Sequence, residues 1–202
     1  MLPILFTILS YCQVPPPVPR VGRNRHLAYE EAPSGTLVTV EGMLVRKNAR
    51  EPLSRLLEAA RKDGIHMRTA TAFRSVEEQR RLFEAGAKKK NISQKSYGWW
   101  TAPPGFSEHH TGLAVDFVEV GNSKADFTPE LFRKTAAFAW LKVRASQFGF
   151  ELSFPENNGL RVAFEPWHWR YVGDEAARAI FAVARAGRVA QDGSTTGNAP
   201  PS

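Results

Sequence analysis

The stretch 107–118 constrains the fold of this chain more than any other, because it places a carboxylate in the middle of an apolar segment. Alternate residues of a strand share a face, so the large apolar side chains of 113–117 lie opposite Asp116. A buried carboxylate is costly unless it meets a cation or several donors. Gly112 allows a sharp turn before the strand, which would let a histidine on the preceding loop fold back beside Asp116. The alternative is an Asp–Arg pair inside the core.

The stretch 164–171 carries Glu165 and His168 three residues apart. In a straight strand these two side chains would point to opposite faces. Pro166 lacks an N–H and favours extended geometry at the residue before it, so a bend there could aim both at one point. Aromatic residues on either side would shelter the pair from bulk water. A lone histidine in such surroundings is more often a hydrogen-bonded core residue.

Together the two stretches offer histidines, an aspartate and a glutamate, without any cysteine. Cys12 is the single cysteine of the chain, so a cysteine zinc site and an internal disulfide are both excluded. Three nitrogen or oxygen ligands with an open position for water are the pattern of catalytic zinc. A nearby carboxylate can then take the proton of the water. The sequence therefore favours a zinc site over a purely structural interpretation.

The two stretches resemble the signature of the zinc D-Ala-D-Ala carboxypeptidase family, in the order Ser107-x-His109-x-x-Gly112-x-Ala114-x-Asp116 and Glu165-x-Trp167-His168. This family includes the vancomycin-resistance carboxypeptidases and dipeptidases and the related L-Ala-D-Glu endopeptidases of phages and bacteria. The segment 72–83 resembles the arginine-containing segment of the same family. The resemblance covers roughly residues 42–173 and implies the α+β fold shared with the hedgehog signalling domain.

The resemblance implies that the zinc ligands are His109, Asp116 and His168. The adjacent His110 needs a decision, because either histidine could reach the metal. The family spacing places the ligand three residues before Gly112, which selects His109. His110 is then a neighbour, either supporting the site or lying at the surface.

The resemblance also implies the catalytic roles. Glu165 matches the base that activates zinc-bound water and then protonates the leaving amine, and Arg74 matches the arginine that steadies the scissile carbonyl as it becomes an oxyanion. An ion pair with Asp116 or Glu165 is the plainer interpretation of Arg74. Ser107 matches a substrate-contacting serine. Gln79 lies on the buried stripe of a predicted helix, so its amide should be hydrogen-bonded, either within the protein or to substrate.

Apolar periodicity predicts an α+β fold with a small, mostly antiparallel sheet flanked by helices. The predicted extended segments are 37–45, 65–73, 112–118 and a final pair over 160–164 and 167–172. Four helices are predicted. The first covers 53–60 and stops at Gly64, and the second runs from the capping box of Ser75 and Glu78 to about Ala85 and stops at Gly86. The third runs from Pro129 toward Gly149, and the fourth follows Asp174. Residues 87–106, which include Trp99 and Trp100, are expected to form an ordered loop or lid. His26 and His66 are expected to be structural or exposed.

The peptidase domain is expected to span residues 20–186. Residues 1–19 combine an apolar start with a proline-rich linker, which predicts an export signal or an anchor, membrane association through residues 1–12, and a location in the periplasm or cell envelope. The alternative for this segment is a disordered hydrophobic tail. Residues 187–202 predict a disordered tail. The net charge of +7 suits an anionic partner such as a cell-wall polymer, and no nucleic-acid-binding motif accompanies it. We expect a monomer that does not bind nucleic acid.

The expected function is hydrolysis of peptidoglycan stem peptides by a zinc peptidase, with D-alanyl-D-alanine carboxypeptidase action as the first interpretation. An L-Ala-D-Glu endopeptidase is the nearest alternative, because the motifs are shared. A catalytically silent zinc-binding or wall-binding module is a third. Glu165 favours an enzyme, because a structural metal site has no use for a base beside the metal.

Overall fold

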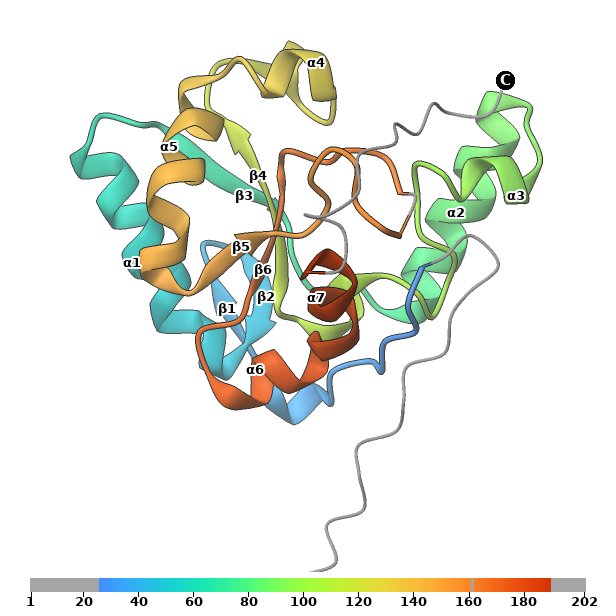
Figure 1. Ribbon diagram of the computed structural model, residues 1–202, viewed down its shortest axis with the longest axis horizontal. Helices are drawn as coiled ribbons and strands as arrows, with labels where there is room; N and C mark the ends of the chain where they lie inside the picture. The colour runs from blue at the N-terminus through green and yellow to red at the C-terminus, as the bar shows by residue number, and fades with distance from the viewer. Residues whose placement is uncertain (1–25, 161, 190–202) are drawn as a thin grey trace, which may run out of the picture.

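A four-stranded antiparallel sheet crosses the protein in the order β3-β4-β6-β5 (Figure 1). Its strands are β3 (Met67–Thr71), β4 (Ala114–Glu119), β6 (His168–Tyr171) and β5 (Phe150–Leu152). The computed structural model describes residues 26–160 and 162–189. Within them the mixture of helices with small antiparallel sheets confirms the predicted α+β class.

Seven helices surround the sheets in the described residues. They are α1 (Lys47–Lys62), α2 (Val76–Lys90), α3 (Gln94–Tyr97), α4 (Pro129–Phe132), α5 (Ala136–Arg144), α6 (Glu175–Ile180) and α7 (Ala182–Val189). Helices α1 and α5 lie on one side of the sheet, and α2 with α3 projects on the other side of the molecule (Figure 1). The predicted stripe of α1 is buried, and its apolar residues join the main core.

The predicted extended segment 37–45 is a hairpin of β1 (Leu37–Val40) and β2 (Met43–Arg46). Its turn residues Glu41 and Gly42 both have positive φ, 45° and 83°, as two-residue hairpin turns with the right-handed twist require. The hairpin supports the main sheet from outside, because the Arg46 N–H donates to the Gly112 carbonyl over 2.8 Å.

The C-terminal half of the fold differs from the prediction in its strand pairing. Residues 162–165 form no strand, so the predicted strand over 160–164 is wrong. Strand β5 takes the place beside β6 instead. The helix expected from Pro129 toward Gly149 is also interrupted, because α4 ends at Phe132 and α5 starts at Ala136. The Thr135 hydroxyl caps α5 by accepting from the Phe138 N–H.

Helix α2 begins at the predicted capping box but runs beyond its predicted end. The Ser75 hydroxyl accepts from the Glu78 N–H over 3.1 Å, and the Glu78 carboxylate accepts from the Ser75 N–H over 2.8 Å. The helix passes through Gly86 to Lys90 and ends at Asn91, which is left-handed. Gly86 has a packing role rather than a stop role, because a Cβ there would lie 2.0 Å from the Tyr97 hydroxyl oxygen. The expected loop 87–106 is therefore partly helical.

The predicted terminal segments lie mostly outside the described residues. The signal or anchor segment 1–19 is entirely outside them. Helix α7 continues to Val189, so residues 187–189 of the predicted tail are helical and the remainder, 190–202, is outside. None of the helices in the part of the chain that the structure describes is long and apolar enough to cross a membrane.

Gly112 holds the turn that leads into β4, and we expect Gly112→Ala to be strongly destabilising. Its φ is +66°, and an added Cβ would lie 2.9 Å from a Leu37 methyl and 3.2 Å from the backbone nitrogen of Arg46. We expect about 2–3 kcal/mol less stability, from the left-handed conformation and the overpacking together. Thermal unfolding measures the effect.

The matched control is Gly121→Ala. Gly121 has φ +84°, with nothing within 4 Å of an added Cβ, so only the conformational cost of about 1–2 kcal/mol applies. Equal losses in the two variants would show that the close approach at Gly112 has no energetic weight.

Candidate metal centre

The metal-binding residues are built around a cross-strand pair. Asp116 on β4 lies directly opposite His168 on β6 in the antiparallel register. Directly opposed side chains of neighbouring strands lie close on the same face. The Asp116 Oδ1 atom is 2.9 Å from Nδ1 of His168, and both residues are buried. The alternation predicted for 113–118 is confirmed, since Leu113, Val115 and Phe117 join the main core while Asp116 faces the cavity.

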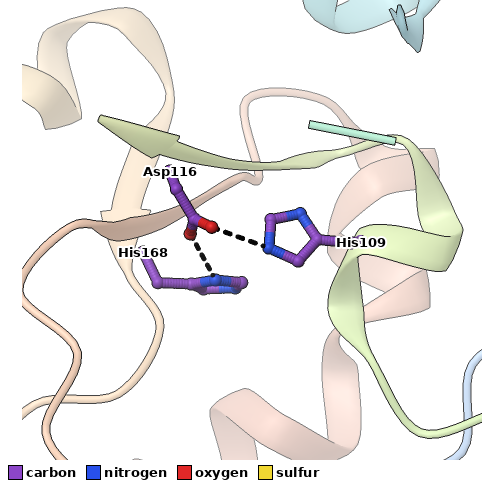
Figure 2. A group of neighbouring side chains, drawn as sticks. All are labelled: His109, Asp116 and His168. Carbon is purple, nitrogen blue, oxygen red and sulfur yellow. Dashed lines mark hydrogen bonds and ion pairs between the residues drawn. The ribbon is translucent and has the colours of Figure 1, made fainter. Parts of the chain in front are cut away.

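His109 completes the cluster from the short 3-10 helix Glu108–Thr111, just before β4. The left-handed Gly112 ends this helix and turns the chain into the strand. His109 Nε2 then lies 3.1 Å from Asp116 Oδ2, so the histidine folds back beside the aspartate as predicted (Figure 2). Thr71 on β3 donates its hydroxyl to the same carboxylate oxygen.

This donor set fits a divalent metal ion. His109, Asp116 and His168 each offer one ligand atom, and the three atoms lie within 4.8 Å of one another. Figure 2 shows both imidazoles directed at the one carboxylate. All three residues are buried, and a second carboxylate, that of Glu165, lies 3.8 Å from His168 Nδ1. A dication would satisfy this concentration of lone pairs and negative charge, and nitrogen and oxygen donors are suited to zinc.

Burial and the charges of neighbouring groups shift the pKa values of all three cluster residues. Burial by itself lowers the pKa of His168, but hydrogen bonds and charges from Asp116 and Glu108 outweigh it and raise this pKa to about 10. Burial raises the pKa of Asp116, but the neighbouring histidines outweigh it and hold the pKa well below its usual range. Burial lowers the pKa of His109, which is therefore neutral at pH 7. Asp116 and His109 are thus already in the protonation states that a metal requires.

Glu165 reaches the cluster through the predicted bend at Pro166. The turn lets the His168 N–H donate to the Glu165 carbonyl over 3.0 Å, which brings both side chains to the same side. Burial raises the pKa of Glu165 to about 8; the Asp116 charge adds to this, and His168 and Arg74 oppose it. A carboxyl with its pKa near neutrality, beside a metal site, has the property of a general acid–base.

Arg74 lies beside the cluster at the corner between β3 and α2. It forms no ion pair with Asp116 or Glu165 in the described residues, so the plainer interpretation of Arg74 is not supported. Its Nε atom is buried without a hydrogen-bond partner there. Burial lowers the Arg74 pKa, and the charges of Asp116 and Glu165 oppose that shift. The guanidinium is thus a cation held close to the cluster and open to a ligand.

A cavity of about 500 Å³ contains all of these groups, which is a typical volume for a small-ligand site. Gln79 and Ser107 also line it. Gln79 donates its Nε2 to the Ala102 carbonyl over 2.6 Å, and its Oε1 is buried without a partner among the described residues. The Ser107 hydroxyl accepts from the His109 N–H over 3.3 Å and so caps the helix that carries the ligand. Trp100, from the segment expected to form an ordered loop or lid, lines the same cavity.

The remaining histidines have structural positions. His110 is fully buried, so it is not a surface residue; its Nδ1 donates to the Arg74 carbonyl over 2.8 Å, and its Nε2 accepts from the Gly105 N–H over 3.1 Å. It supports the site by fixing the backbone of Arg74. His26 is buried and donates to the Gly98 carbonyl over 2.7 Å, while His66 is exposed.

Glu108 is a residue beside the cluster that the sequence did not reveal. Its Oε2 atom lies 3.2 Å from Nε2 of His168, on the side of the ring away from Asp116. In the sequence, Glu108 and His109 indicate only two adjacent polar residues in a loop. The contact of Glu108 with His168 cannot be predicted from them, because it depends on the pairing of β4 with β6.

One cavity holds a buried cluster of two histidines and an aspartate, with a carboxyl group and an arginine beside it. This arrangement is typical of the class of mononuclear metallopeptidase-like proteins. Residues 42–174 match the VanY family, described as D-alanyl-D-alanine carboxypeptidase. The chain belongs to this family.

Named relatives and solved structures agree with this assignment. A D-alanyl-D-alanine carboxypeptidase of Enterococcus faecalis is 34% identical over 142 residues, which are 64% of this chain and 48% of that protein. The LD-carboxypeptidase LdcB is 31% identical with a TM-score of 0.60, covering 75% of this chain and 74% of that one. VanY from a VanB-type resistance cassette has been solved in complex with Zn(II); it is 29% identical with a TM-score of 0.58, covering 79% and 93%. The chain spans about half the length of the curated relatives it matches.

Proposed function

We propose that this protein is a zinc-dependent D-alanyl-D-alanine carboxypeptidase that removes the terminal D-alanine of peptidoglycan stem peptides. The observation that carries the proposal is the convergence of His109, Asp116 and His168 beside Glu165 in one cavity. Membership of the VanY family supports the choice of bond, and the Zn(II) complex of a VanY relative supports the choice of metal.

In this proposal His109, Asp116 and His168 hold the zinc ion. The bound ion supplies Lewis acidity, which polarises the scissile carbonyl and makes an attacking water more acidic. Glu165 accepts a proton from that water at its carboxylate as the new carbon–oxygen bond forms. It then gives the proton to the amine nitrogen as the peptide bond breaks, so that the leaving D-alanine departs neutral at nitrogen.

Arg74 stabilises the charge that develops on the scissile carbonyl oxygen. Its backbone is held by the hydrogen bond from His110 to the Arg74 carbonyl, and its buried Nε has no protein partner in the described residues. A fixed cation in a site with little water acts most strongly on a developing oxyanion, because no reorganisation is needed during the reaction. Gln79 and Ser107 are proposed to bind the substrate, and the unpartnered Oε1 of Gln79 is the acceptor available for it.

The substrate also suggests where the protein acts. Peptidoglycan stem peptides lie outside the cytoplasmic membrane, so we propose export to the periplasm or cell envelope. The apolar start of residues 1–19 supports this. A monomer is proposed because the cavity and all of its named residues belong to one chain.

Product identification tests the choice of bond. Pentapeptide, tetrapeptide and whole muropeptides are incubated separately with the zinc-loaded protein, and the products are identified by mass spectrometry. Loss of one D-alanine from the pentapeptide alone supports the proposal. Trimming of the tetrapeptide would indicate LD-carboxypeptidase activity, as in the name of the LdcB neighbour, and cleavage beside L-alanine would indicate the endopeptidase. No cleavage of any substrate by a zinc-loaded protein would favour the silent binding module.

Zinc uptake is expected to release protons and to strengthen as the pH rises. In the metal-free protein the raised pKa of His168, about 10, keeps the imidazole protonated at pH 7, and a ligand nitrogen must be free of its proton. Glu165, with a pKa of about 8, is also mostly protonated at pH 7, and a nearby dication favours its ionised form. Raising the pH toward 9 therefore removes competing protons.

Calorimetric titration in buffers of different ionisation enthalpy measures this release. We expect about one to two protons per zinc at pH 7, with affinity rising about tenfold per pH unit for each proton released. A zinc affinity independent of pH between 7 and 9 would contradict the protonation state assigned to His168.

A further inference from the structure

The Glu108 carboxylate is buried, and four groups lie within hydrogen-bond distance of it. Its Oε1 accepts from Arg170 Nη1 over 2.7 Å and from the Tyr29 hydroxyl over 3.3 Å. Its Oε2 accepts from the Ser153 hydroxyl over 2.5 Å and faces His168 Nε2 at 3.2 Å. These four groups come from three separate segments of the chain, because Arg170 and His168 both lie on β6. Their convergence fixes the direction of each Glu108 oxygen.

The contact with His168 determines which ring nitrogen is free to bind a metal. His168 Nδ1 faces Asp116 and the metal cluster, whereas Nε2 faces Glu108. An ionised carboxylate only accepts hydrogen bonds, and each ring nitrogen of His168 faces one. When a metal binds Asp116 and displaces the proton of Nδ1, the one remaining proton of the ring is held on Nε2 by Glu108. The lone pair of Nδ1 is then directed at the cluster. Carboxylates in this position orient ligating histidines and increase their basicity.

We propose that Glu108 is the positioning residue that selects Nδ1 of His168 as the metal ligand and tightens the binding of the metal. This inference rests on the proposed zinc site but goes beyond it, because the proposed hydrolysis gives Glu108 no part in moving protons or in binding substrate. It acts through His168.

A purely structural role for Glu108 would be to neutralise Arg170, and the structure separates the two roles. Arg170 has a second carboxylate partner, because its Nε donates to Glu151 Oε1 over 2.8 Å. Glu151 lies directly opposite Arg170 across the β5–β6 pair, and it also pairs with Arg185. Arg170 therefore keeps a counter-ion when Glu108 loses its charge, and Glu151 provides a control for the loss of a charge on Arg170.

The experiment compares zinc affinity in the full chain with Glu108→Gln and with Glu151→Gln. Each variant loses one negative charge from the same arginine and keeps its side-chain size, but only Glu108→Gln alters the partner of His168. Competition with a chromophoric zinc chelator at fixed pH measures affinity, and thermal unfolding of the metal-free proteins measures stability. We expect zinc affinity to fall about 10- to 100-fold in Glu108→Gln and to remain within about twofold in Glu151→Gln.

Equal zinc affinity in the two variants would overturn the inference. If the wild type itself binds no zinc, the proposed function fails instead, so the two failures are distinguishable.

A second measurement does not depend on the folding of any Glu108 variant. Nitrogen-15 spectra of zinc-loaded wild-type protein report which ring nitrogen of His168 carries the proton, with His168 assigned by its loss in His168→Gln. A proton on Nε2 and zinc on Nδ1 support the inference. A proton on Nδ1 would overturn it.

Discussion

Glu165→Gln is expected to lower kcat on a D-Ala-D-Ala substrate by about 10²- to 10⁴-fold while leaving zinc bound. The amide has nearly the shape of the carboxylate but can neither take a proton from water nor return it to the leaving amine. The metal ligands are untouched, because Glu165 Oε2 is 3.8 Å from His168 Nδ1 and Asp116 is the carboxylate within hydrogen-bond distance of both imidazoles. Steady-state kinetics and metal analysis on the same preparation measure both effects.

Glu156→Gln is the control for the loss of one carboxylate elsewhere. Glu156 is exposed and pairs with Arg133, outside the cavity, so we expect kcat within about twofold of the wild type. Hydrolysis at the wild-type rate by Glu165→Gln would remove Glu165 from its proposed role. Loss of zinc together with activity would make Glu165 a ligand rather than a base.

Asp116→Asn is expected to abolish both zinc binding and hydrolysis. Asp116 contacts both histidines of the cluster, at 2.9 Å and 3.1 Å, and its low pKa keeps it ionised at neutral pH. An amide offers a neutral oxygen where the dication needs a charged one. We expect zinc affinity to fall by more than about 100-fold, beyond the range typical of outer-shell partners.

The comparison with Glu165→Gln separates metal binding from proton transfer. Both variants replace a carboxyl group of the same cavity by an amide with little change in shape, yet only Asp116→Asn should lose the metal. Chelator competition and circular dichroism of the metal-free proteins measure affinity and folding. A zinc-loaded Asp116→Asn protein with unchanged affinity would contradict the ligand assignment.

The residues of the metal cluster could be predicted because their signals are local. The period-two alternation after Gly112 fixed the side of the strand on which Asp116 lies, and the structure buries it there. The proline before Trp167 indicated the bend that brings Glu165 and His168 together, and the structure has that turn. The direct pairing of Asp116 with His168 was beyond these signals, because register depends on which strands become neighbours.

The elements that were wrong or missing lacked local signals or depended on tertiary contacts. Strand β5 has three residues, too few for an alternation to be recognised, and it occupies the edge that the sequence suggested for 160–164. Gly86 was predicted to end the helix, but it lies inside α2, where it packs against Tyr97. The sequence does contain signals for the true end of α2, namely the three lysines of its last turn and Asn91, which adopts the left-handed conformation after it.

Glu108 shows the limit of sequence reasoning about the site. Its neighbours in sequence give no hint of its partners, since Arg170, Ser153 and Tyr29 are at least 45 residues away along the chain. A buried acid with so many distant donors is recognisable only when the sheet is assembled.

Anomalous diffraction at the zinc edge, from crystals of the zinc-loaded full chain, tests the central claim most directly. The account predicts one strong peak coordinated by His109 Nε2, an oxygen of Asp116 and His168 Nδ1, with zinc–nitrogen distances of about 2.0–2.1 Å. A peak located elsewhere, or no peak near these three residues in fully loaded protein, would contradict it.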